Sequence, residues 1–331
     1  MNQSFPYQLL NKTELITSIN QLATQNIPFL LIIDYKAESG YVIPESAINH
    51  EFVRYAIGDE LVTEKMENHQ RPAWKPVPVS EDSYLRKFNF VVDNIRRGNS
   101  FLVNLTQPTL VHTNLNLNQL FQLGKAKYKL WLKNRFVVLS PESFIKIRDG
   151  KIYSYPMKGT IDASIPDAAN LIMNDKKEQA EHATIVDLIR NDLSMVAHQV
   201  EVVRYRYIDK LHTNVGDLLQ VSSEICGKLP GNFLPQLGEI IFKLLPAGSV
   251  TGAPKSKTLE IIEAAEGYSR GFYTGIFGWF DGQNLDTAVM IRFVEQQGNQ
   301  LVFKSGGGIT SLSNAQKEYN ELIRKVYVPL Y

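Results

Sequence analysis

Cysteine and long apolar runs are both scarce in this sequence. Cys226 is the only cysteine, so an internal disulfide framework is excluded and a reducing, cytoplasmic compartment is expected. The apolar run Phe29–Ile33 is far shorter than the ~20 residues that a membrane-spanning helix needs, so no membrane association is expected. The first residues lack a basic segment followed by an apolar one, so no signal peptide is predicted.

An excess of charge of either sign is also absent. Lys and Arg number 35, and Asp and Glu number 34, which leaves a formal net charge of +1. A chain with this balance has no general electrostatic attraction for nucleic acid or for an anionic membrane, so neither is expected as a partner. Hydrophobic residues make up 44% of the chain, enough for a substantial core in one large domain or two.

The order of helix and strand signals predicts an α+β fold. Apolar residues at helical spacing predict helices over 13–24, 84–95, 117–125, 175–197, 237–245 and 254–265, and a last helix from 314. Apolar runs between turn signals predict strands over 28–35, 101–106, 136–139, 144–148, 151–155, 272–280, 286–296 and 301–304. Because hairpin turns such as Asp149-Gly150 are mixed with long helices, the sheets should be large and mostly antiparallel.

A proline-rich stretch over 67–82 is the most linker-like segment of the chain. We therefore predict an N-terminal segment, residues 1–75, that packs on a main domain, residues 76–331.

Two Glu-x-x-Glu pairs are the most informative local pattern. Glu178 and Glu181 form one pair, and Glu318 and Glu321 form the other. On a helix, i, i+3 spacing points both carboxylates of a pair from one face. Two such helices would repel each other unless a cation lay between them, and carboxylate ligands suit Mg²⁺ held against an anionic substrate.

Each pair also has a purely structural interpretation. Asp175 and Glu178 have the spacing of a helix capping box. Glu321 and Lys325 have the spacing of an ordinary i, i+4 surface ion pair. The residues alone do not decide between a metal site and these structural roles.

The segment 244–257, LLPAGSVTGAPKSK, combines glycine turns with the start of a helix. A helix N-terminus attracts anions through its free amides. A nucleotide-binding P-loop is excluded, because that motif needs Gly-Lys in direct succession and Ala253 and Pro254 separate Gly252 from Lys255.

Eight stretches resemble, in the same order, the motifs of the chorismate-utilising enzymes, a family that includes anthranilate, isochorismate, salicylate and aminodeoxychorismate synthases. They are GNSFLVNLTQP (98–108), SPESF (140–144), PMKGT (156–160), EHATIVDLIRNDLSMVA (181–197), LLPAGSVTGAPK (244–255), RGFYTGIFGWF (270–280), DTAVMIRF (286–293) and GGGITSLSNAQKEYNELIRKV (306–326). The resemblance implies antiparallel sheets packed as a sandwich with outer helices, chorismate as substrate and Mg²⁺ as cofactor.

Lys158 selects the chemistry that this resemblance implies. It stands in PMKGT where aminodeoxychorismate synthases carry lysine and the other members usually carry alanine. A desolvated, partly neutral amine is a good nucleophile toward an electrophilic ring carbon; a lysine in solvent at a strand end is the alternative. Leu102 stands where isochorismate and salicylate synthases carry a general-base lysine, and where amine-transferring members commonly carry Gln. This strand therefore offers no base for attack by water.

Glu142 in SPESF matches the general acid of the family. A carboxyl group in an enclosed apolar site has a raised pKa and can protonate a departing hydroxyl; a loop carboxylate that caps a turn is the alternative. The resemblance also implies that Glu181 and Glu321 bind Mg²⁺ directly. Glu178 and Glu318 would reach the ion directly or through water.

The two carboxylates of chorismate must meet cations or free amides. Arg292 is expected among inward-facing residues of the strand over 286–296, where a carboxylate would pair its charge. The amides of Gly306, Gly307 and Gly308, expected in a loop, can approach an anion closely. The resemblance adds further substrate-binding candidates: Tyr273, Lys325, Thr160, Thr251 and His182. For His182, a hydrogen-bonded core histidine is the alternative.

The resemblance implies conversion of chorismate and ammonia to 4-amino-4-deoxychorismate, in para-aminobenzoate and folate biosynthesis, through a covalent intermediate at Lys158. Because Cys226 lies in EICGK rather than in a nucleophile turn, ammonia is expected from a separate glutamine amidotransferase subunit. The alternatives are anthranilate synthase component I and a non-catalytic chorismate-binding homologue.

Overall fold

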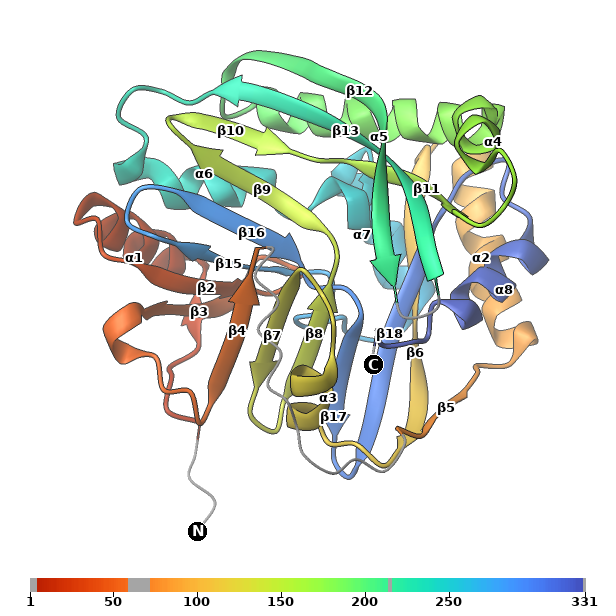
Figure 1. The fold of residues 1–331 in the computed structure, drawn as a ribbon, viewed down its shortest axis with the longest axis horizontal. Helices are drawn as coiled ribbons and strands as arrows, with labels where there is room; N and C mark the ends of the chain where they lie inside the picture. The colour runs from red at the N-terminus through yellow and green to blue at the C-terminus, as the bar shows by residue number, and fades with distance from the viewer. Residues whose placement is uncertain (1–4, 59–71, 214–215, 330–331) are drawn as a thin grey trace.

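The computed structural model describes residues 5–58, 72–213 and 216–329, and within these ranges the strands form two large antiparallel sheets (Figure 1). The ten-stranded sheet has the order β1 (Leu10–Asn11), β3 (Ser39–Pro44), β2 (Phe29–Ile33), β15 (Ile276–Phe280), β16 (Leu285–Val289), β9 (Ser143–Arg148), β10 (Lys151–Ser154), β13 (Gly216–Lys228) and β11 (Met157–Asp162), with β12 (His198–Thr213) paired to β13. The eight-stranded sheet has the order β14 (Gly252–Ala253), β6 (Leu102–Thr113), β18 (Gln300–Ile309), β17 (Phe293–Gln297), β8 (Phe136–Ser140), β7 (Tyr128–Leu132) and β4 (Val53–Ile57), with β5 (Trp74–Val77) paired to β6.

Helices cover the outer faces of the sheets. They are α1 (Lys12–Thr24), α2 (Glu81–Arg96), α3 (Leu117–Leu123), α4 (Ala168–Asn174), α5 (Lys176–Ser194), α6 (Leu237–Leu244), α7 (Lys255–Glu266) and α8 (Ala315–Arg324), with short 3₁₀ turns η1 (Glu45–Ala47), η2 (Leu234–Gln236) and η3 (Gly248–Val250). α1 packs on α6 at one end of the molecule, whereas α2, α7 and α8 gather beside β6 and β18 at the other (Figure 1). α5 lies along β11, β12 and β13. None of the described helices is long and apolar enough to cross a membrane.

β2 shows how the core is divided, because all five of its residues are buried. Successive side chains of a strand point to opposite faces of the sheet. Leu30 and Ile32 therefore face the second sheet, in one apolar cluster with Leu130 and Phe293, and the alternate residues face the helix layer of α1 and α6. Each such side chain contributes roughly 1.5–3 kcal/mol by its burial. The predicted α+β fold, with large antiparallel sheets and outer helices, is confirmed.

Two predicted strands end elsewhere than expected. The strand predicted over 286–296 is broken, since β16 ends at Val289 in one sheet and β17 begins at Phe293 in the other. Arg292 lies between them with a φ of +52°, in a bend rather than on a strand face. The loop predicted at Gly306–Gly308 is wrong as well, because β18 continues through all three glycines, which pair with β6.

The first 75 residues contribute strands to both sheets. β1, β2 and β3 belong to the ten-stranded sheet, and β4 belongs to the other. Part of the proline-rich stretch, residues 67–71, lies outside the described residues. The division at residue 75 stays a prediction.

Candidate active site

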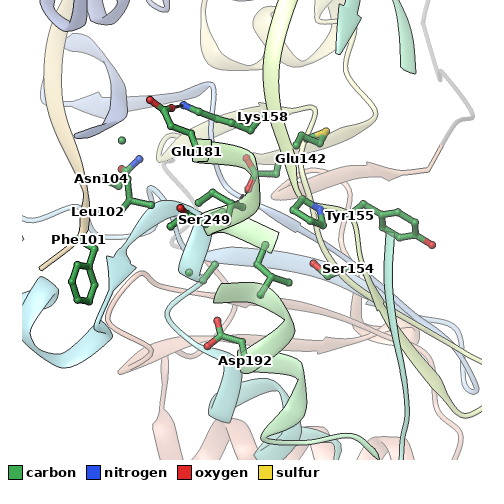
Figure 2. A pocket seen from close by; sticks show the side chains of 18 of the residues that line it. Phe101, Leu102, Asn104, Glu142, Ser154, Tyr155, Lys158, Glu181, Asp192 and Ser249 are labelled. Atoms are coloured by element: carbon green, nitrogen blue, oxygen red, sulfur yellow. Dashed lines mark hydrogen bonds and ion pairs between the residues drawn. The ribbon is translucent and has the colours of Figure 1, made fainter. Parts of the chain in front are cut away.

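Two adjoining cavities lie where β6, β11, β18, α5 and η3 approach one another. Their volumes are 580 and 200 Å³. Five residues line both of them, so they are two parts of one cleft; these are Asn104, Glu142, Lys158, Ser249 and Gly308. Figure 2 shows Lys158, Glu142 and Ser249 around the cleft, with Leu102 and Asn104 on the neighbouring strand. The predicted nucleophile and the predicted acid, which are 16 positions apart in the sequence, therefore face one space.

Lys158 reaches the cleft from an irregular part of β11. The register of β11 against β13 shifts between Met157 and Thr160, and Gly159 has a φ of +90°, a conformation that favours glycine. A side chain at this glycine would also be crowded, since its Cβ would lie 3.2 Å from Glu178 Oε2. The bulge and the glycine thus bring the Lys158 backbone close to α5.

The Lys158 amine makes an ion pair with Glu181. Lys158 Nζ lies 2.7 Å from Glu181 Oε2, and about a third of the side chain, 32%, is exposed. Burial lowers the pKa of Lys158, but the carboxylates of Glu181, Glu178 and Glu321 outweigh it, so the pKa is raised. The amine is therefore protonated at neutral pH, and a nucleophilic role would require it to lose that proton first.

The four predicted metal-binding glutamates come from α5 and α8 and interact with Lys158, and Glu181 lines the larger cavity. A Cβ on Gly307 would lie 3.8 Å from Glu318 Oε2 and 4.0 Å from Glu321 Oε1, and Lys158 interacts with carboxylates of both helices. Burial raises the pKa of Glu178 and of Glu318, and the second carboxylate of each pair contributes to the rise.

Lysines balance these carboxylates in the structure. Lys177 lies 3.4 Å from Glu181 Oε1, and Lys325 lies 2.7 Å from Glu321 Oε1. Burial acts to raise the pKa of Glu321, but Lys325, Lys158 and Lys177 outweigh it, so the pKa is lowered. No three His, Cys, Asp or Glu side chains of the described residues are close enough to share a metal ion as placed. The donors nevertheless fit Mg²⁺ in kind, since they are carboxylates of two facing helices with excess negative charge.

The structural interpretations of the glutamate pairs are realised in part, since Glu321 pairs with Lys325 but only the Asp175 half of the expected capping box forms. The Asp175 side chain caps α5 by accepting a hydrogen bond from the Glu178 amide at 3.0 Å, and Glu321 pairs with Lys325. The cap engages only the backbone of Glu178, so its carboxylate stays available. The last helix is capped by Asn314, whose side chain accepts from the Lys317 amide.

Glu142 is held rigidly in the connection between β8 and β9. Its amide donates to Ser140 Oγ at 3.1 Å, and its carbonyl accepts from the Val289 amide at 3.1 Å. Ser249 Oγ donates to its carboxyl group at 2.6 Å. Burial raises the pKa of Glu142, although the Ser249 hydroxyl and the Lys325 ammonium act in the opposite direction. A carboxyl group with this bias is suited to give up a proton inside the cleft.

The smaller cavity is lined by the predicted carboxylate-binding groups, namely Tyr273, Arg292, Gly306, Gly307, Gly308 and Lys325. The Arg292 guanidinium lies 4.1 Å from the centre of the Tyr327 ring. Its Nη1 atom is buried without a hydrogen-bond partner. An anion in the cavity would satisfy that donor.

The glycine strand presents amides to the same cavity. Thr106 and Asn104 of β6 lie opposite Gly306 and Gly308 of β18. Their amides donate elsewhere, to the Glu266 side chain and to the Thr251 carbonyl. Neither pair is therefore a hydrogen-bonded pair of the two strands. The N–H groups of these two glycines therefore point away from β6. β17 pairs with β18 only as far as Lys304, so this edge of β18 is open toward the cavity.

The structure does not bring three of the predicted substrate-binding residues to the cleft wall. Thr160 is exposed beyond the bulge of β11. The Thr251 hydroxyl is fully buried and donates to the Ala247 carbonyl at 2.9 Å. His182 is also fully buried, with Nε2 2.7 Å from Ser223 Oγ, and burial lowers its pKa. This is the arrangement of a core histidine, and substrate-binding roles for these residues stay predictions.

Sequence reasoning missed several polar residues of the cleft, among them Asn104 and Ser249, which line both cavities. Both lie inside stretches that carried the resemblance. Asn104 is two positions after Leu102 on β6, so the period of a strand places it on the same face. Ser249 gave no comparable signal, because the contact with Glu142 spans 107 positions of sequence.

An acid, an amine and anion-binding groups in one enclosed cleft of an α+β sandwich define an enzyme site rather than a plain binding surface. A family model described as chorismate binding enzyme matches residues 26–331, and the chain belongs to that family of enzymes. It is 48% identical over 317 residues to an uncharacterized PabA-like protein of Pasteurella multocida, covering 95% of this chain and 98% of that protein.

Relatives with named activities are more distant and longer. Identity is 30% to aminodeoxychorismate synthase component 1 of Bacillus subtilis, over 76% of this chain and 55% of that one. It is 32% to an anthranilate synthase component 1 of Haloarcula marismortui, over 74% of this chain and 52% of that one. The menaquinone-specific isochorismate synthase of Escherichia coli superposes with a TM-score of 0.73 at 16% identity, covering 96% of this chain and 82% of that one. At that identity, the superposition shows the fold alone.

Proposed function

We propose that this enzyme converts chorismate and ammonia to 4-amino-4-deoxychorismate, the aminodeoxychorismate synthase reaction, which supplies para-aminobenzoate and folate biosynthesis. The observation that carries the proposal is the presence of Lys158 and Glu142 in both parts of one cleft. An amine and a carboxyl with a raised pKa are the groups needed to add to a ring and to expel its hydroxyl.

The chemistry follows from these two side chains. Lys158 Nζ gives its proton to solvent, leaves Glu181 and bonds to C2 of the ring as a secondary ammonium, while the double bonds shift and the C4–O bond breaks. Glu142 gives its proton to the departing oxygen, which leaves as water. Ammonia then bonds to C4, and the C2–N bond breaks to return Lys158 as the free amine.

Substrate binding falls to the cations and amides of the smaller cavity. Arg292, Lys325, Gly306 and Gly308 line this cavity, and the two cations and the glycine amides would receive the carboxylates. Glu181 and Glu321 would hold Mg²⁺, with Glu178 and Glu318 next to them. When bound, Mg²⁺ supplies positive charge that neutralises a substrate carboxylate.

The test is a comparison of wild type, Lys158→Ala and Lys151→Ala with chorismate, Mg²⁺ and ammonium. Lys151 is an exposed lysine of β10, so its variant controls for loss of a surface charge. Lys158→Ala should lose at least about 10²-fold in aminodeoxychorismate formation, and Lys151→Ala should match wild type. Without ammonium, intact-protein mass spectrometry should find wild type carrying chorismate less one water. Equal rates for wild type and Lys158→Ala would refute the nucleophile.

Ammonia is proposed to come from a glutamine amidotransferase subunit. With glutamine in place of ammonium, the chain alone should form no product, and added amidotransferase subunit should restore formation. Glutamine-dependent product from the isolated chain would contradict this.

Anthranilate synthase component I is the second candidate, favoured by the 32% identity to the Haloarcula marismortui relative. The same ammonium assay separates the two, because accumulation of fluorescent anthranilate would favour the second candidate. Tight chorismate binding with no product at all would favour a non-catalytic homologue.

A further inference from the structure

Ser249 makes a side-chain contact that joins two distant motifs at the proposed acid. It belongs to η3, its hydroxyl donates to Glu142 Oε1 at 2.6 Å, and both residues line both cavities (Figure 2). No other side-chain hydrogen bond to the Glu142 carboxyl group occurs among the residues that the structure describes.

The turn that carries Ser249 is fixed from several directions. The Val250 and Thr251 amides donate to the Ala247 and Gly248 carbonyls at 3.2 Å. Gly248 lies against α5 so closely that a Cβ there would be 3.0 Å from Leu188 Cδ2. The Glu142 backbone is fixed as well, by its bonds to β8 and β16. The 2.6 Å contact is therefore set by two rigid backbones rather than by two mobile side chains.

We propose that Ser249 is the positioning residue of the general acid: its hydroxyl fixes one oxygen of the Glu142 carboxyl group, so that the other oxygen carries the proton toward the leaving hydroxyl. This inference rests on the proposed function. In the neutral acid, Oε1 is the carbonyl oxygen that accepts from Ser249, and Oε2 bears the proton. After transfer, the same hydroxyl donates to the carboxylate, so the contact persists on both sides of the step.

Other groups around the carboxyl do not replace this contact. Lys325 acts on Glu142 through its charge, and the buried Tyr273 lies close enough to interact with it. Lys158 and Arg292 line the smaller cavity with it. Loss of the Ser249 hydroxyl removes a donor that favours the ionised carboxyl, so the pKa of Glu142 should rise further.

The experiment compares Ser249→Ala, Ser249→Thr and Ser154→Ala with wild type. Ser154 is a matched control, because it also lines the larger cavity but donates to the Phe144 carbonyl at 3.0 Å. Ser249→Ala should lose about tenfold in kcat with KM within about twofold, and the basic limb of its pH–kcat/KM profile should move to higher pH. Ser249→Thr retains a hydroxyl, so it should recover most of the rate and the basic limb of wild type. The basic limb of Ser154→Ala should also match that of wild type.

A second readout does not depend on turnover. Infrared difference spectra against Glu142→Gln isolate the protonated carboxyl band of Glu142, whose pH midpoint should be higher in Ser249→Ala than in wild type. If wild type forms no aminodeoxychorismate, the proposed function fails while this titration still reports on the contact. An unchanged midpoint, or a lower kcat with an unmoved basic limb, overturns the positioning role.

Discussion

Replacement of Arg270 by Met should destabilise the enzyme and disturb the cleft together. Arg270 is 3% exposed, and its guanidinium donates to both oxygens of Glu266, at 2.6 and 2.9 Å. It also donates to the Asn104 carbonyl of β6 at 2.7 Å and to the Val250 carbonyl of η3 at 2.9 Å. One buried side chain thus holds together two walls of the cleft, and the change removes all of these donors at once.

The size of the effect follows from what is left behind. The carboxylate of Glu266, a residue 3% exposed, would retain the Thr106 amide and hydroxyl at 2.8 and 2.7 Å as donors. No cation of the described residues would then bond to that carboxylate, since Lys87 Nζ donates to the Glu266 backbone carbonyl. Removing one partner of a buried ion pair costs about 3–5 kcal/mol. We expect Arg270→Met to lose that much free energy of unfolding. Glu266→Leu combined with Arg270→Met should lose less, because no buried charge is then uncompensated.

Urea unfolding measures these differences, and an exposed ion pair provides the control. Arg190 and Asp187 of α5 lie 2.8 Å apart with side chains 49% and 60% exposed, so Asp187→Asn should change stability by less than about 1 kcal/mol. A loss below ~1 kcal/mol for Arg270→Met, or a double variant less stable than the single one, would refute the reasoning.

Three further predictions concern the cleft itself. Gly159→Ala should lose activity and about 1 kcal/mol or more of stability, because the new Cβ would strain a backbone at positive φ and lie 3.2 Å from Glu178. Urea unfolding and steady-state rates measure both losses, and an active, equally stable variant would contradict the prediction. The pKa of Glu142 is raised on folding, so the folded state is favoured fully below the unfolded pKa of 4.5 and loses stability as pH rises through the folded pKa. Glu142→Gln removes that loss and should raise the thermal midpoint at about pH 7 but not at about pH 4. Equal gains at both pH values would contradict the direction of the pKa shift. Leu102→Lys combined with Lys158→Ala should shift product from amine to isochorismate, because it adds a base for water and removes the nucleophile; chromatography that finds no isochorismate contradicts it.

Local chemistry in the sequence was enough to predict several elements of this fold. The Asp149-Gly150 turn joins β9 to β10 as expected, with both residues at positive φ, because the turn needs that conformation whatever surrounds it. α1 and α5 lie close to their predicted ranges, since each has a side-chain cap and an apolar stripe. Such signals are contained in the residues that form the element.

Where a strand continues or ends depends instead on its neighbours. β18 passes through Gly306–Gly308 because β6 is long enough to pair with it there, although glycine disfavours strands on its own. β12 and β13 were not predicted; β12 pairs with β13, which also pairs with β10 and β11. Arg292 lines the smaller cavity, but it comes from the crossing between the sheets and not from a strand face as predicted.

The two lysines of the proposed chemistry are both engaged by the carboxylates proposed to hold the metal. Lys158 pairs with Glu181 and Lys325 pairs with Glu321, each at 2.7 Å. If both amines turned to a substrate, Glu321 would lose the cation that it pairs with and Glu181 would keep only Lys177, 3.4 Å away; a partly buried carboxylate is unfavourable without a positive partner. A divalent cation shared by Glu181 and Glu321 would provide that partner for both at once. In the proposed reaction, release of Lys158 and of Lys325 would then be coupled to binding of that cation.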